Sequence, residues 1–126
     1  MQQTWPQEIT RFLARPVPIF AHLAVAAAGE TPWMCRSYGY RPNLETDRLI
    51  LYILRRQGQR LQAYAERSPM LAALLTSGTD NESYQFKGRF EQLRPLDADD
   101  AAAIEAQRGR TAAHTPNLVQ IGRAHV

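Results

Sequence analysis

Arginine is the residue type whose placement in this chain most favours ligand chemistry. Arg36 falls in a predicted strand, Arg41 follows that strand, and Arg60 falls near the start of a segment with helical periodicity. Guanidinium groups bind phosphate through paired hydrogen bonds and stay charged. A helix that starts near Gln57 would add backbone N–H donors at its positive end. These residues favour a site for a phosphorylated ligand. The alternative for Arg36 is an ordinary strand-face arginine paired with a carboxylate, and the alternative for Arg60 is a solvated arginine at a helix start.

Other chemistries have little support in the sequence. Cys35 is the only cysteine, which excludes an internal disulfide and a cysteine-cluster zinc site, and its strand position is typical of a small buried side chain. His22 has no cysteine, aspartate or second histidine at metal-ligand spacing. The chain contains no Gly-x-Ser-x-Gly, P-loop or dinucleotide-binding motif. We therefore expect no metal site and assign no catalytic residue.

The composition is that of one ordinary globular domain. The chain has 126 residues, of which 44% are hydrophobic and 21% charged, and this length supports one core. The pI is about 9.4, but the net charge is only +3. A solvated surface explains this balance, while an anionic small ligand or a nucleic acid stays open. Segment 16–28 is too short to span a bilayer, and no secretory signal is evident, so we expect a cytoplasmic protein with no membrane partner.

The periodicity of the sequence predicts an α+β fold. Alternation and turn residues predict five strands, and helical spacing with capping residues predicts three helices. The helices are expected to begin at Thr4, Arg55 and Asp97, with Asp97, Asp99 and Asp100 explained as capping and helix-dipole residues. The strands are expected at 19–27, 33–40, 48–54, 70–76 and 83–93, with turns at 28–32, 41–47 and 77–81. Consecutive antiparallel strands favour a small barrel or a curled sheet.

The last predicted strand, SYQFKGRFEQL, has one apolar face and one polar face. Tyr84, Phe86 and Phe90 fall on the apolar face, which favours a role in the core. Gly88 lies between Lys87 and Arg89, where we expect a bulge or the close approach of another backbone. The two cations are explained most simply as a solvated strand face. Their alternative role, together with Phe90, is to bind a single-stranded nucleic acid.

Three segments in this order resemble the FMN-binding split barrel of the pyridoxamine 5'-phosphate oxidase-like superfamily. They are Met34–Arg41, Leu51–Arg60 and Tyr84–Gly88, within a resemblance that spans roughly Ile9 to Arg110. The resemblance implies a small antiparallel split barrel over residues 1–120 and a homodimer that builds its flavin site across the interface. It also implies an FMN-dependent oxidoreductase whose substrate and electron donor the sequence does not identify.

The resemblance also implies which residues hold the cofactor. In the family, an arginine begins the second strand and a basic residue ends it. An aromatic–polar pair lies beside the isoalloxazine, and a basic pair at the next turn holds the phosphate. A glutamine on the fifth strand contacts the flavin. The matching positions in this chain are Arg36, Tyr38, Arg41, Tyr52, Ile53, Gln59, Arg60, Ser83 and Gln85. Related barrels bind haem or deazaflavin, or bind a flavin without turnover. A non-catalytic binder is therefore the alternative, and a nucleic-acid-binding barrel comes third.

The last six residues, 121–126, match an in-frame translation of a sequencing adapter, ATC GGA AGA GCA CAC GTC. We therefore expect them to be an artefact appended to a domain whose natural C-terminus is longer. Within them, Arg123 and His125 imitate the Arg-x-His substrate motif of pyridoxamine phosphate oxidases. We set that match aside, because it lies inside the adapter translation.

Overall fold

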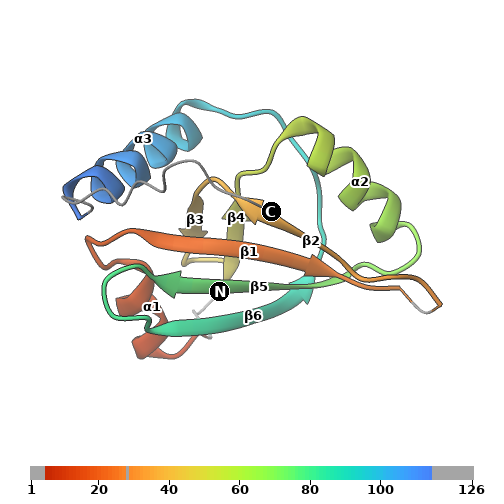
Figure 1. Cartoon of the computed structure of the whole chain (residues 1–126), viewed down its shortest axis with the longest axis horizontal. Coiled ribbons are helices and arrows are strands. Elements are labelled where there is room, and N and C mark those ends of the chain that lie inside the picture. Colours follow the sequence, from red (N-terminus) through yellow and green to blue (C-terminus); the bar gives the residue numbers. More distant parts are fainter. Residues whose placement is uncertain (1–4, 28, 115–126) are drawn as a thin grey trace, which may run out of the picture.

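The computed structural model describes residues 5–27 and 29–114, and these form three helices and six strands (Figure 1). The predicted adapter translation and the Arg-x-His match lie outside the described residues. Helices and strands occur in the order α1 (Gln7–Leu13), β1 (Ile19–Val25), β2 (Trp33–Ser37), β3 (Tyr40–Asn43), β4 (Arg48–Leu51), α2 (Arg55–Ala65), β5 (Met70–Ser77), β6 (Ser83–Arg89) and α3 (Ala98–Ala113). The α+β class predicted from the sequence is confirmed.

Four strands pair into one antiparallel sheet in the order β2-β1-β5-β6 (Figure 1). Strand β1 pairs with β2 from Ala21↔Ser37 to Val25↔Trp33, and with β5 from Ile19↔Ser77 to Val25↔Leu71. Strand β6 extends the sheet on the far side of β5. Strands β3 and β4 form a separate two-stranded sheet. Neither sheet closes on itself, so the structure shows antiparallel sheets without a closed barrel.

The chain leaves the large sheet at Gly39, which the sequence analysis placed inside one continuous strand. Gly39 has a φ of +155°, and a Cβ atom there would lie 3.1 Å from the Tyr52 ring, so a side chain is poorly tolerated. Beside it, the Tyr38 N–H donates to the Tyr52 carbonyl at 2.7 Å, and the Tyr52 N–H donates to the Gly39 carbonyl at 3.1 Å. Strand β3 then covers Tyr40–Asn43. The prediction of a turn at 41–47 was therefore wrong for its first three residues.

Helix ends follow the predicted capping logic at α3 but not at α1. Asp97 caps α3 and accepts a hydrogen bond from the Asp100 N–H at 2.9 Å, as predicted. The positions of Leu96 and Ala101 around this cap also predict a hydrophobic staple, and that staple is absent, because Leu96 is exposed. Helix α1 begins at Gln7 after Pro6, whose fixed φ suits a helix start, and Thr4 lies outside the described residues.

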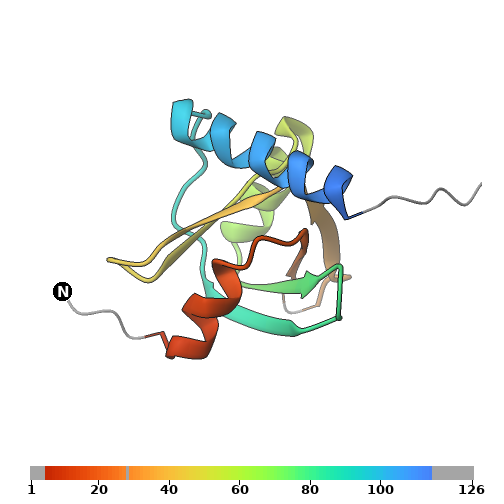
Figure 2. The same cartoon turned by 90° about the vertical axis from the view of Figure 1, so that its left-hand side faces the viewer.

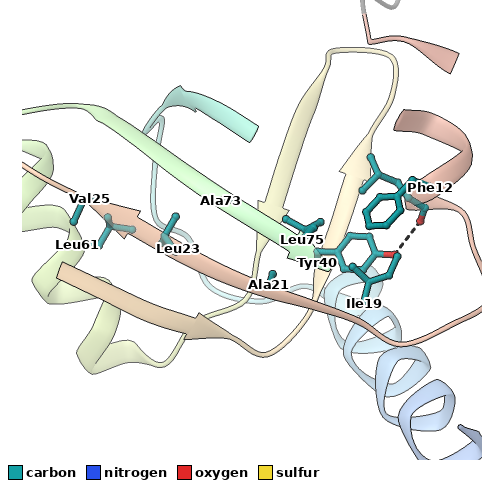
Figure 3. Packing of buried hydrophobic residues seen from close by; sticks show 10 residues of the cluster. Phe12, Ile19, Ala21, Leu23, Val25, Tyr40, Leu61, Ala73 and Leu75 are labelled. Atoms are coloured by element: carbon teal, nitrogen blue, oxygen red, sulfur yellow. Dashed lines mark hydrogen bonds between the residues drawn. The ribbon is translucent and has the colours of Figure 1, made fainter. Parts of the chain in front are cut away.

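The core lies on one face of the four-stranded sheet, against α1, α2 and the β3–β4 hairpin (Figures 2 and 3). Phe12 from α1 and Leu61 from α2 pack against alternate residues of β1 and β5. Tyr40 from β3 joins them and donates its hydroxyl to the Leu13 carbonyl at 2.9 Å, the bond drawn in Figure 3. The buried hydrophobic side chains are Phe12, Leu13, Ile19, Ala21, Leu23, Val25, Tyr40, Tyr52, Leu61, Ala73 and Leu75.

Strand β6 has the two faces that the alternation predicted, but Gly88 has neither of the expected roles. Tyr84 and Phe86 pack against the core, and the Tyr84 ring lies edge-on to Phe12 with centroids 4.8 Å apart. Gly88 pairs with Leu71 in a regular register, so no bulge forms. No atom lies within 4 Å of a Cβ placed at Gly88, so no backbone of the described chain approaches it. Gly88 lies on the same side of β6 as Tyr84 and Phe86, but the space beside it is open.

No helix among the described residues is long and apolar enough to cross a membrane. The longest, α3, has 16 residues and carries charged side chains along its length.

Leu74 and Leu75 on β5 test the assignment of the two sheet faces. Leu75 is fully buried, whereas the side chain of Leu74 is exposed on the opposite face. We expect Leu75→Ala to lower the free energy of unfolding by about 2–5 kcal/mol, because the cavity in the core does not refill. Leu74→Ala should lower it by less than about 1 kcal/mol. Urea unfolding measures both changes, and similar losses in the two variants would contradict the assignment.

Candidate functional site

Two adjoining hollows lie where strand β2 meets the first turns of helix α2. One, with a volume of about 220 Å³, is lined by Trp33, Met34 and Cys35 of β2 and by Arg56, Gln57 and Arg60 of α2. The second, of about 470 Å³, is lined by Leu54, Arg55, Arg56 and Gln59. Both are open to solvent. Arg56 lines both hollows and therefore lies at the boundary between them.

The arginines around these hollows have no carboxylate partner within the part of the chain that the structure describes. Arg55, Arg56 and Arg60 make no ion pair there, and the first turn of α2 contains no acidic residue. Most other arginines do pair with carboxylates, namely Arg11, Arg15, Arg41, Arg48, Arg67, Arg94 and Arg108. The positive charge at the start of α2 is therefore available to an anion.

The start of α2 is built from a short extended segment followed by a helix with a folded-back glutamine. Leu54 is extended, with φ −68° and ψ 151°, and its carbonyl accepts the first helical hydrogen bond from the Gly58 N–H at 2.9 Å. The Gln57 side chain reaches back and accepts the Leu54 N–H at 2.8 Å. The N–H groups that precede Gly58 in the helix have no intrahelical acceptor, and the helix dipole adds partial positive charge there.

Trp33 fixes one side of the smaller hollow. The Arg60 guanidinium lies over its ring at 5.3 Å from the centroid, and the Tyr64 ring stacks with it at 6.3 Å. Arg60 and Tyr64 are one helical turn apart on α2, so this stack holds the helix against the edge strand β2. The pKa of the neighbouring Cys35 thiol is raised by burial, which disfavours the reactive thiolate. The smaller hollow therefore combines an aromatic wall with cationic side chains.

Arg41 and Tyr52, which were predicted to contact the flavin, meet instead at a buried carboxylate. The Asp100 side chain has no solvent exposure, and its Oδ1 accepts hydrogen bonds from the Tyr52 hydroxyl at 2.8 Å and from Arg41 Nη2 at 3.0 Å. Arg94 donates to Asp100 Oδ2 at 2.6 Å. The Asp97 N–H donates to the same oxygen at 2.9 Å. We call Arg41, Tyr52, Arg94 and Asp100 the Asp100 cluster.

The Asp100 cluster keeps its charges over the physiological pH range. Hydrogen bonds from Arg94, with further help from the Asp97 N–H, Tyr52 and Arg41, hold the pKa of Asp100 far below its usual range against the opposing effect of burial. Burial raises the pKa of Tyr52 to about 12, so its hydroxyl stays protonated and donates to the carboxylate. Hydrogen bonds to Tyr52 and Asp100 raise the pKa of Arg41. Asp100, Arg41 and Arg94 are therefore charged at neutral pH, while Tyr52 contributes a neutral donor.

Asp100 has a role that local patterns in the sequence do not reveal. Its place in the first turn of α3 was explained completely by capping and by the helix dipole, and that explanation was incomplete. Asp97 and Asp100 do form the expected reciprocal cap. The additional bonds come from Arg41 and Tyr52, which are 59 and 48 positions away in the sequence. No local pattern connects positions so far apart.

The remaining predicted residues lie either on the sheet face opposite the core or beside the core itself. Arg36 and Gln85 lie on the face of the four-stranded sheet opposite the core, in the cross-strand row Arg36↔His22, His22↔Leu74 and Leu74↔Gln85. On that face the Arg36 guanidinium lies over the Tyr38 ring at 5.5 Å from the centroid.

Ser83 donates its hydroxyl to Thr76 at 3.0 Å on the adjacent strand. Ile53 packs against the core beside Gly58. Of the predicted set, only Gln59 and Arg60 line the hollows at α2. The hollows are also lined by Arg55, Arg56 and Trp33, which no pattern in the sequence predicted as site residues.

Comparison with protein-family models, with curated proteins and with solved structures finds no match for this chain. Among the described residues, no group of three or more histidine, cysteine or acidic side chains is placed to hold a metal ion.

Asp100→Asn tests the Asp100 cluster. Removing the carboxylate leaves Arg41 and Arg94 without their buried partner, and we expect the free energy of unfolding at pH 7 to fall by about 3 kcal/mol. Asp99→Asn is the matched control, because Asp99 is exposed in the same helical turn. It should cost only about 0.3–1 kcal/mol, through the lost charge near the helix dipole. Denaturant titration measures both variants, and equal losses would contradict a special role for Asp100.

The effect of Asp100→Asn on the free energy of unfolding should also depend on pH. The folded-state pKa of Asp100 lies below its unfolded value, so the unfolded chain binds a proton first as the pH falls. The stability that Asp100 contributes is complete above the unfolded pKa of about 3.9 and is lost progressively below it. We expect the stability difference between wild type and Asp100→Asn to shrink between pH 5 and pH 3 in thermal unfolding. A difference that is constant over this range would contradict the assignment.

Proposed function

We propose that this chain binds FMN, with the phosphate held at the start of helix α2. The observation that carries the proposal is the set of arginines without a carboxylate partner among the described residues, namely Arg55, Arg56 and Arg60, around hollows that open at a helix N-terminus. A dianionic phosphate satisfies guanidinium groups and free backbone N–H groups together. The residue types at the site match those that the phosphate of FMN requires.

Arg56 has the central role in the proposed phosphate site. It lines both hollows, whereas Arg60 lines the one beside Trp33 and Arg55 lines the other. A phosphate near Arg56 would lie between Arg55 in one hollow and Arg60 in the other. A guanidinium group pairs bidentately with phosphate oxygens. Gln57 and Gln59 offer neutral amides for the ribityl hydroxyls. Trp33 and Cys35 supply the less polar wall on which a ring system can lie.

The structure changes which residues we assign to the cofactor. Arg41 and Tyr52 are occupied in the Asp100 cluster, and Tyr52 is buried. Arg36 and Gln85 lie on the open sheet face, away from the core side of the strands. We therefore assign phosphate binding to the arginines of α2 and give Arg41 and Tyr52 a positioning role. Arg41 lies on the β3–β4 hairpin, and Tyr52 follows that hairpin directly, three residues before the first residue of α2.

A bound FMN would supply hydride and electron transfer, which makes an FMN-dependent oxidoreductase of the pyridoxamine 5'-phosphate oxidase-like kind the proposed class. The chain's own residues would bind the phosphate, orient the ring and shield one side of it. The split barrel, the homodimer and the cytoplasmic location that this class implies stay predictions. The alternative is a binder of flavin, deazaflavin or haem without turnover, and a nucleic-acid-binding module is the third candidate.

The affinity of the protein for FMN and for riboflavin tests this proposal, because the two ligands differ only in the phosphate. We expect wild type to bind FMN more tightly than riboflavin. We expect Arg56→Ala to weaken FMN binding by about 1.5–3 kcal/mol, the range for hydrogen bonds to charged groups. Its affinity for riboflavin should change little. Flavin fluorescence quenching or calorimetry measures these affinities.

Arg108→Ala is the matched control, because Arg108 is an exposed helical arginine far along the chain on α3. It removes the same charge and should leave both affinities unchanged. Equal affinity of wild type for the two flavins would refute the phosphate site. A loss on Arg108→Ala as large as that on Arg56→Ala would show that only the net charge matters.

A further inference from the structure

The four-stranded sheet has a second face that no described element covers. Alternate residues of all four strands lie on this side, opposite the buried residues of the core. They are Met34 and Arg36 of β2, Phe20, His22 and Ala24 of β1, Met70, Ala72, Leu74 and Thr76 of β5, and Ser83, Gln85, Lys87 and Arg89 of β6. We call this set the open face.

The open face carries large apolar side chains in contact with water. Phe20, Met34, Met70 and Leu74 are exposed by 36%, 65%, 50% and 45%. Three of them come from the central strands β1 and β5, and Met34 lies beside Ala24 in the register. The pair Ala24↔Ala72 lies between the larger residues, so the surface is lower there. Contiguous exposed apolar groups of this kind mark interaction sites on soluble proteins.

Positive charge flanks this apolar centre on both edge strands. Arg36 lies on β2, and Lys87 and Arg89 lie on β6. None of the three makes an ion pair with a described residue, and the paired strands place no carboxylate on the open face. Contact between the open faces of two copies would therefore bring cations together without a carboxylate to compensate them.

The size of the open face fits one helix. Four strands of about seven residues cover an area about 19 Å wide and 23 Å long, or about 440 Å². This is about half of what each partner contributes to a standard stable interface. A helix with its side chains is about 10–12 Å across. Laid along β1 and β5, it would cover the apolar centre and bring its flanks close to both edge strands.

From these observations we propose that the open face docks an acidic amphipathic helix of a partner protein. Apolar side chains of that helix would contact Phe20, Leu74 and Met70 and fill the low area at Ala24↔Ala72. Glutamate or aspartate on its flanks would pair with Arg36 on one edge and with Lys87 and Arg89 on the other. Flexible methionines suit such a surface, because they adapt to varied apolar partners. A single-stranded nucleic acid fits less well, because the aromatic rings of β6 are in the core.

A designed peptide tests the proposal on the full chain. The probe is a helix of about 15 residues, which spans the length of the face, with leucine on one side and glutamate on both flanks. The control peptide has lysine in place of every glutamate. We expect the glutamate peptide to shift backbone NMR signals of the open-face residues, whereas the lysine peptide leaves them unchanged. The same chain at the same concentration serves for both titrations.

Protein variants then locate the contact. Leu74→Glu should weaken binding of the glutamate peptide by about tenfold or more, the effect of a central interface residue. Lys87→Glu, on the edge strand, should weaken it by a smaller factor, because the new carboxylate repels the glutamates of the peptide. Arg108→Glu makes the same charge change as Lys87→Glu on exposed α3 and should have no effect. Both face residues are exposed, so the variants should fold, and circular dichroism verifies this.

Several results would overturn the proposal. Equal binding of the lysine peptide would remove the charge argument, and signal shifts confined to other surfaces would remove the site. Concentration-dependent shifts of open-face signals without peptide would assign the face to a second copy of the chain. Tighter binding of oligothymidine or of phosphatidylserine vesicles through the same residues would assign it to nucleic acid or to a membrane surface. No open-face shift at millimolar glutamate peptide would also refute it.

Discussion

The buried carboxylate of Asp100 is the constraint on which the arrangement of this chain depends. Its charge is compensated by Arg41 from β3, by Arg94 from the segment before α3 and by the Tyr52 hydroxyl just after β4. A buried charge that loses such partners is costly, so these elements keep one relative position. Tyr52 lies three residues before the first residue of α2. The cluster therefore also sets where the first turn of α2, with its unpaired arginines, meets strand β2.

The cations of the chain have two distinct uses. Paired arginines hold elements together, as Arg15 does between the end of α1 and the β5–β6 turn through Asp80 and Glu82. Cations that make no ion pair with a described residue lie around the hollows at the start of α2 and on the edges of the open face. The modest net charge of +3 conceals this separation. The two unpaired groups are the parts of the surface best suited to bind something acidic.

Local patterns in the sequence predicted what depends on local physics. Strands β1, β5 and β6, helix α2 and the Asp97 cap of α3 follow from alternation, helical spacing and capping chemistry, and all are present. The partner of Arg41 could not be predicted, because Asp100 lies 59 positions away and either residue alone has an ordinary explanation. The break at Gly39 depends on pairing with Tyr52, and the regular pairing of Gly88 depends on β5. Such features depend on tertiary contacts that periodicity does not encode.

The absorption spectrum of the purified full chain, recorded before and after adding FMN and removing free ligand, tests the central claim most directly. If FMN binds at the start of α2, the protein should keep a flavin absorption spectrum after free ligand is removed. The spectrum should correspond to one flavin per site, either as purified or after FMN is added. Such a spectrum would support a flavoprotein in which the arginines of α2 hold the phosphate. A Soret band would instead assign the site to haem. A protein that stays colourless and retains no added FMN would contradict the claim.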